Sequence, residues 1–178
     1  MEVVVNGLNF ELNENTFTAK ILKCTEQIDD IFIPRSIKFN SKEYIITTLG
    51  QNFSENSNNF KSLTFLDDSE LQILEKKCLA ISLISHLKIP STVTKIDEQA
   101  LFFCDHLTSV DFSANSQIIS IETEAFNGSN ISHITFPHSI KFIGDRSFFY
   151  CQNLKSIEFS PNSQLEIIGK EAFSGTYI

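Results

Sequence analysis

The stretch FPHSIKFIGDRSFFYCQNLKSIEF, residues 136–159, contains one complete repeat unit, from which the fold can be predicted. Its last six residues, LKSIEF, place apolar side chains at the first, fourth and sixth positions. This LxxLxL pattern begins at residues 28, 60, 84, 107, 131 and 154, so a first interval of 32 residues is followed by intervals of 24, 23, 24 and 23. Such a period is typical of a solenoid, because one short unit cannot bury its apolar face alone and must stack on the next.

A second motif lies between the strands that LxxLxL predicts. An isoleucine is followed five positions later by a phenylalanine in SIETEAF (120–126), FIGDRSF (142–148) and IIGKEAF (167–173). We expect these IxxxAF segments to return along the opposite side of each turn as short helical or 3-10 turns. Their phenylalanines are expected to fill the core.

Successive units alternate between two forms. A proline follows the strand directly in every second unit, at Pro34, Pro90 and Pro137, where its missing N–H suits a strand exit. The true repeat is therefore a pair of units, 23 + 24 = 47 residues long. The predicted fold class is α/β: a right-handed leucine-rich-repeat solenoid with a parallel β-sheet on one face and short helical or 3-10 turns opposite.

The sequence divides into a cap and a solenoid. Residues 1–27 alternate between apolar and polar side chains, and we interpret them as an N-terminal β-hairpin cap over the first repeat. Residues 28–178 form the predicted solenoid of about six repeats. The first interval is 32 − 23 = 9 residues too long, and we expect a hairpin insertion near residues 37–48, around Asn40-Ser41.

Composition limits the partners. The 178 residues carry a formal charge of −8 with a pI near 4.9, and such an acidic chain repels phosphate backbones, which argues against nucleic-acid binding. No apolar run approaches the roughly 20 residues of a membrane span, so we expect no direct membrane insertion. The N-terminal residues MEVVVNGLNFELNEN do not predict a conventional signal peptide, because a basic segment and a long apolar segment are both missing.

Catalytic and metal-binding patterns are weak. The sequence has no G-x-S-x-G, G-x-G-x-x-G or P-loop motif, and although a Ser/His/Asp triad can be assembled on paper, we expect no enzyme activity and no cofactor. His86 and His133 lie two repeats apart, too far for a shared metal site. The cysteines form no CxxC motif and are expected to be small buried thiols: Cys24, Cys78, Cys104 and Cys151.

The outward-facing strand positions form two columns along the predicted sheet. The first column reads Phe32, Thr64, Lys88, Asp111, Thr135 and Glu158. The second column reads Asp30, Ser62, His86, Ser109, His133 and Ser156. These side chains are mostly small, polar or of mixed charge, which favours a protein or glycoprotein ligand over a small molecule.

The stretch 136–159 resembles the repeat of the BspA-like, or treponema-type, leucine-rich-repeat family, whose pattern is IPxSIxxIGxxAFxxCxxLxxIxF. Members of that family are found on bacterial and protist cell surfaces and are associated with adhesion to host or matrix proteins. The resemblance implies a non-catalytic protein-binding module in adhesion, at the cell surface or secreted. Two other hypotheses stay open: an intracellular, cytoplasmic scaffold for protein–protein interaction and a hydrolytic enzyme.

The C-terminal edge of the predicted solenoid is apolar. Ile178 falls where the next strand is expected to begin, because 154 + 24 = 178. Solenoids normally carry a polar cap over an open edge of this kind. We therefore expect self-association through the C-terminal edge near Ile178.

Overall fold

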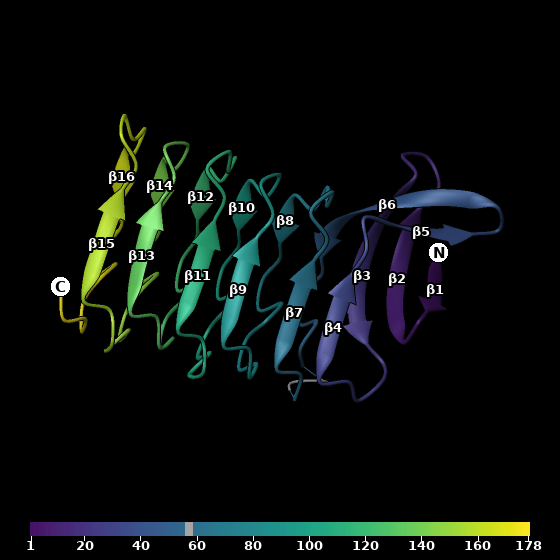
Figure 1. The fold of residues 1–178 in the computed structure, drawn as a ribbon, viewed down its shortest axis with the longest axis horizontal. Coiled ribbons are helices and arrows are strands. Elements are labelled where there is room, and N and C mark those ends of the chain that lie inside the picture. The colour runs from purple at the N-terminus through teal and green to yellow at the C-terminus, as the bar shows by residue number, and fades with distance from the viewer. Residues whose placement is uncertain (56–58) are drawn as a thin grey trace.

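The computed structural model describes residues 1–55 and 59–178 and shows a solenoid of about six turns (Figure 1). One strand of each turn lies on the same face, and the N- and C-termini lie at opposite ends of this row of strands (Figure 1). The strands of the row are β4 (Asp30–Ile33), β7 (Ser62–Phe65), β9 (His86–Ile89), β11 (Ser109–Phe112), β13 (His133–Phe136) and β15 (Ser156–Phe159). Within the described ranges the structure contains no helix that is long and apolar enough to cross a membrane.

A second, ten-stranded sheet also runs through the molecule. It begins as an antiparallel meander of β1 (Glu2–Val5), β2 (Leu8–Asn13) and β3 (Thr18–Cys24). It continues as a parallel ladder with one two-residue strand per turn. These short strands are β8 (Ile73–Leu74), β10 (Lys95–Ile96), β12 (Ser120–Ile121), β14 (Phe142–Ile143) and β16 (Ile167–Ile168).

Within the ten-stranded sheet, a β-hairpin links the N-terminal meander to the short strands of the repeats. Its strands are β5 (Ser36–Phe39) and β6 (Lys42–Leu49), which pair in antiparallel fashion. Asn40 and Ser41 between them have φ values of 48° and 61°, the left-handed conformation that a tight two-residue hairpin turn requires. Since β6 also pairs in parallel with β3 and with β8, the hairpin extends the ladder from the meander into the solenoid.

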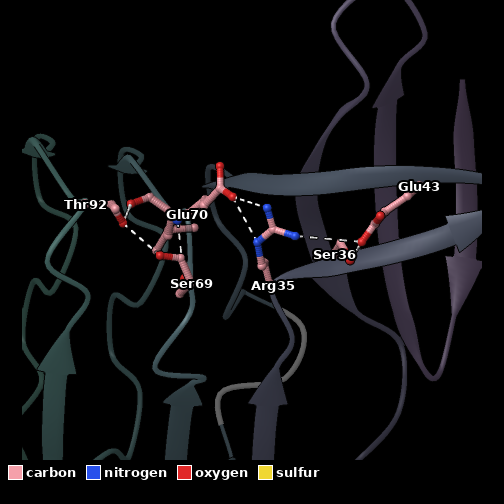
Figure 2. Close-up of polar contacts among 7 residues, drawn as sticks. Arg35, Ser36, Glu43, Ser69, Glu70 and Thr92 are labelled. Atoms are coloured by element: carbon pink, nitrogen blue, oxygen red, sulfur yellow. Dashed lines mark hydrogen bonds and ion pairs between the residues drawn. The ribbon is translucent and has the colours of Figure 1, made fainter.

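Arg35, the residue before β5, anchors this hairpin to the following turn (Figure 2). Its Nε donates to Glu70 Oε1 at 2.9 Å, and its Nη1 lies 3.9 Å from Glu43 Oε1. Glu43 Oε1 also accepts a hydrogen bond from Ser36 Oγ at 2.5 Å. The hydrogen bond from Arg35 to Glu70 and the charge of that carboxylate raise the pKa of Arg35. The guanidinium thus bridges the hairpin and the turn that precedes β8.

Serines spaced by 47 residues hold the turn after every second strand. Ser69, Ser116 and Ser163 each accept, through Oγ and at 3.3 Å, the backbone N–H two residues further along the chain. Around the first of these turns, Thr92 Oγ1 donates to the carbonyls of Ser69 and Leu71 at 3.1 and 2.7 Å (Figure 2). The hydrogen bond from the backbone N–H to the serine Oγ is present in each pair of units, which explains why a serine recurs at this spacing.

The predicted helical or 3-10 turns are not observed in the described residues, which form strands and turns and no α/β arrangement. The reason lies in the hydrogen bonds of the IxxxAF segments. Glu124 and Phe126 donate N–H groups to the carbonyls of Asp145 and Ser147 in the next turn, at 2.9 and 2.7 Å. A helix needs such N–H groups for bonds within its own turn. Glu124 and Arg146 also have φ values of 56° and 52°, a left-handed conformation in which a right-handed helix cannot continue.

The phenylalanines of the IxxxAF segments fill the core, as predicted. Phe126 and Phe148 are fully buried, and their ring centroids lie 5.0 Å apart with 9° between the planes. Phe173 continues the stack at 5.3 Å and 11° from Phe148. The stacking distances are close to the roughly 4.8 Å spacing of adjacent strands, so equivalent side chains of successive turns meet face to face.

All four cysteines are buried. The thiols of Cys104 and Cys151 donate to the carbonyls of Leu79 and Phe126, at 3.1 Å in each case. Burial raises the pKa of Cys104 to about 11 and the pKa of Cys151 to about 12. Both groups are therefore protonated and weakly nucleophilic at neutral pH.

Candidate functional site

The outer face of the six-strand row carries the twelve side chains that the sequence singles out. Ser62 and Ser109 are half-buried, and the other ten side chains are exposed: Asp30, Phe32, Thr64, His86, Lys88, Asp111, His133, Thr135, Ser156 and Glu158. The alternate strand residues point into the core, where Leu87 and Ile89 are buried on either side of Lys88.

Parallel pairing places these side chains next to one another across neighbouring strands. The aligned pairs are Asp30 with Ser62, Phe32 with Thr64, His86 with Ser109, Lys88 with Asp111, His133 with Ser156, and Thr135 with Glu158. Each pair joins one strand that ends at a proline to the strand that follows it in the row.

The polar contacts on this face are exposed. Ser62 Oγ donates to Asp30 Oδ1 at 2.5 Å, and Lys88 Nζ lies 3.1 Å from Asp67 Oδ1. The side chains of Lys88 and Asp67 are 65% and 94% exposed. Such pairs contribute less than about 1 kcal/mol, because water solvates the separated charges almost as well. A partner can therefore displace these contacts at little cost in free energy.

His86, Ser109 and Asp111 meet on β9 and β11 with the atom types of a catalytic triad. His86 Nδ1 lies 2.8 Å from Ser109 Oγ, whereas His86 Nε2 lies 3.7 Å from Asp111 Oδ2, which is too long for a hydrogen bond. The histidine and aspartate side chains are 51% and 62% exposed, while a triad needs a buried carboxylate that orients the imidazole. The geometry therefore lacks the buried, hydrogen-bonded carboxylate of a catalytic triad.

The arrangement of possible metal ligands can be compared with what a metal site requires. Within residues 1–55 and 59–178, no group of three or more His, Cys, Asp and Glu side chains is placed to hold a metal ion. His86 and His133 lie on strands separated by β11, as the repeat spacing predicts.

Prolines divide the row of strands into three hydrogen-bonded pairs: β4 with β7, β9 with β11, and β13 with β15. Within two of these pairs, the residue after the second strand donates to the last carbonyl of the first, as Ser160 N does to Phe136 O at 2.9 Å and Leu66 N does to Ile33 O at 3.2 Å. Between β11 and β13 the equivalent donor position is Pro137, which has no N–H to offer the Phe112 carbonyl. Pro90 has the same effect between β7 and β9.

A hollow lies at each of these two interruptions. The hollow between β7 and β9 has a volume of about 100 Å³, and its lining includes Asp67, Lys88 and Pro90. The hollow between β11 and β13 has a volume of about 430 Å³. It is lined by Val110, Asp111, Phe112, Ser113, Ala114, His133, Thr135, Pro137 and Ser160.

Sequence reasoning missed the contribution of Asp67, Ser113, Pro137 and Ser160 to this face. The signal was the spacing of the prolines, which we interpreted only as strand exits. A proline after every second strand also interrupts the sheet after every second strand, because each proline lacks one ladder donor.

A parallel β-solenoid that presents one exposed strand per turn has the architecture of a leucine-rich-repeat protein. The BspA type leucine rich repeat region matches residues 19–155 and 72–178, in six copies. The chain therefore belongs to the BspA-type leucine-rich-repeat family. None of the curated protein sequences matches it significantly.

Solved structures of bacterial proteins share the fold. The leucine-rich-repeat protein of T. pallidum superposes with a TM-score of 0.75 at 13% identity, over 88% of this chain and 71% of that one. The pneumococcal vaccine antigen PcpA gives a TM-score of 0.70 at 16% identity, over 92% and 51% of the two chains. A leucine rich cell surface protein from Faecalibacterium prausnitzii gives 0.51 at 18% identity, over 89% and 54%. This chain thus spans about half the length of the last two proteins.

Proposed function

We propose that this protein is a non-catalytic module that binds a protein or glycoprotein along the outer face of its strand row. The observation that carries the proposal is the exposure of ten of the twelve outward side chains on one face. The face is long, open and of mixed polarity, which suits a macromolecular ligand better than a small enclosed one.

Adhesion at the cell surface is the biological role that we propose for this binding. Two structural neighbours support it, since one is described as a cell surface protein and another as a vaccine antigen. Members of the repeat family are associated with the same role. Labelling of intact cells with a membrane-impermeant reagent tests the location: labelled protein is expected, and its absence would favour the intracellular scaffold.

The binding face is tested by removing three of its charges together. The variant Lys88→Ala/Asp111→Ala/Glu158→Ala is immobilised beside the wild type and exposed to host-cell and matrix extracts. We expect the proteins retained by the wild type to be lost or strongly reduced. Unchanged retention would contradict binding through this face.

A matched control changes the same kinds of charge away from the face. Lys76→Ala/Glu98→Ala/Glu166→Ala removes one cation and two anions whose side chains are 42%, 44% and 65% exposed. This control alters the net charge equally and should retain the wild-type partners. Loss of binding in both variants would indicate a general charge effect.

We also propose self-association through the C-terminal edge. The apolar side chains of Phe159, Ile167, Ile168, Tyr177 and Ile178 are exposed there. An exposed strand edge with apolar side chains favours pairing with another chain. Light scattering should show oligomers at high concentration, and Ile168→Lys should reduce them because it places a charge in the contact. A monomeric wild type at high concentration would contradict this proposal.

A further inference from the structure

We infer that the hollow between β11 and β13 receives a basic side chain, arginine or lysine, of the protein partner. The inference rests on the proposed function and specifies the chemistry that the strand row recognises. Its basis is the lining of this hollow and the way in which the chain itself fills the equivalent place one double repeat earlier.

The hollow is built to accept hydrogen bonds. Pro137 leaves the Phe112 carbonyl without the ladder N–H that Ser160 gives to Phe136. The other acceptors in the lining are one carboxylate and three hydroxyl groups, on Asp111, Ser113, Thr135 and Ser160. No lysine or arginine is among the lining residues. Carboxylate, carbonyl and hydroxyl oxygens together match the several N–H donors of a guanidinium or ammonium group.

The first hollow shows how the same repeat position looks when the chain supplies the cation itself. Lys88 lines the hollow between β7 and β9 and ion-pairs with Asp67 at 3.1 Å. The positions of Lys88 and Asp67 in the next double repeat are occupied by Thr135 and Ala114, since 135 − 88 = 114 − 67 = 47, so both members of this ion pair are replaced there. The second hollow, with threonine in place of lysine, has more than four times the volume, about 430 against about 100 Å³. A partner's basic side chain would take the place that Lys88 takes in the first hollow, and Asp111 would be its charged partner, because the counterpart of Asp67 is Ala114.

The charges around the second hollow favour a cation. The ionisable side chains that line it or neighbour its lining residues are Asp111, Glu158, His86, His133 and Lys88. Lys88 is the cross-strand neighbour of Asp111, yet its ammonium group pairs with Asp67. The chain as a whole carries a formal charge of −8, which attracts a basic partner over a longer range.

The probe for this inference is N-acetyl-arginine amide, with N-acetyl-citrulline amide as its uncharged isostere. Binding is followed by amide chemical shifts of the isotope-labelled full chain at pH 8. We expect the arginine probe to shift residues 110–114 and 133–137 with a millimolar dissociation constant. Equal shifts with the citrulline probe, or shifts confined to other residues, would overturn the inference.

Two variants separate the hollow from general electrostatics. Asp111→Asn should weaken binding of the arginine probe by about threefold to tenfold, because the cation loses its charged partner. Asp105→Asn removes the same charge from the exposed turn before β11, outside the lining, and should leave binding unchanged. Equal weakening in both variants would show that only net charge matters and would overturn the inference.

A third variant fills the hollow from within. Thr135→Lys introduces the residue found at position 88. We expect it to abolish the amide shift changes that the arginine probe causes at residues 110–114. Thr135→Gln is its uncharged control of similar length, and retained folding is checked by the dispersion of the remaining amide signals. Probe binding that survives Thr135→Lys would contradict the inference. Failure of all probe experiments, with partner capture still sensitive to the triple face variant, would refute the basic side chain and leave the proposed function standing.

Discussion

The ring of Phe148 stacks on the ring of Phe126 in the preceding turn, with centroids 5.0 Å apart and 9° between the planes. Phe173 stacks on its other side at 5.3 Å, and Phe136 meets it edge-on at 5.7 Å. One fully buried side chain therefore links three successive turns of the solenoid.

Replacing Phe148 should destabilise the protein strongly. Phe148→Ala removes a buried ring and leaves a cavity between turns, and we expect a loss of about 3–5 kcal/mol in the free energy of unfolding. Urea denaturation followed by circular dichroism measures this loss. Phe32→Ala, which removes a ring that is 65% exposed, is the control and should change stability by no more than about 0.5 kcal/mol. Similar losses in the two variants would contradict the role of the phenylalanine stack.

Gly144 is required because adjacent turns approach closely there. A Cβ at this position would lie 2.6 Å from the carbonyl carbon of Glu122 and 2.7 Å from the nitrogen of Thr123, both backbone atoms. Gly144→Ala should therefore cost about 1–3 kcal/mol in thermal or urea unfolding. Lys141→Ala, at an exposed side chain shortly before it, should be nearly neutral. A stable Gly144→Ala protein would show that the turns separate more easily than their packing indicates.

Stability should fall in alkaline solution because of two buried thiols. The pKa of Cys104 is raised to about 11 and that of Cys151 to about 12, against 9.0 for an unperturbed cysteine. Below pH 9.0 both thiols are protonated in the folded and unfolded states, and their full contribution to stability is present. Above that pH the unfolded chain loses these protons first, so each thiol lowers the free energy of unfolding by up to about 1.4 kcal/mol per pH unit.

The measurement is the urea midpoint between pH 8 and the alkaline limit of folding. The double variant Cys104→Ala/Cys151→Ala starts from a lower stability but should decline less steeply than the wild type. Cys78, whose pKa burial also raises, is present in both proteins and cancels in the comparison. Identical pH slopes would contradict the raised pKa values.

Restoring the missing ladder donor should join β11 to β13. Pro137→Ala introduces an N–H that can reach the Phe112 carbonyl in the way that Ser160 reaches Phe136. We expect this new amide to exchange slowly with solvent deuterium, and the arginine probe to bind more weakly because the hollow narrows. Pro161→Ala, in the turn after β15, should not affect the probe. Rapid exchange at position 137 would show that the proline is not the cause of the gap.

The strands could be predicted from sequence because a solenoid is built from local, repeated information. The pattern LKSIEF at 154–159 contains β15, and the equivalent patterns contain the other strands of the row. The return segments could not be predicted in the same way. IxxxAF has the spacing of a short helix, but Glu124 and Phe126 give their N–H groups to the next turn, and this choice depends on how closely the turns stack.

The repeat length, the strand row, the core phenylalanines and the twelve outward residues follow from periodicity along the chain. The interruptions of that face depend instead on how the turns stack in three dimensions. Phe112 and Pro137 are 137 − 112 = 25 residues apart and become ladder neighbours only when the turns stack. The hollow between them, with Asp111 in its lining, arises from a hydrogen bond that proline cannot make across that contact.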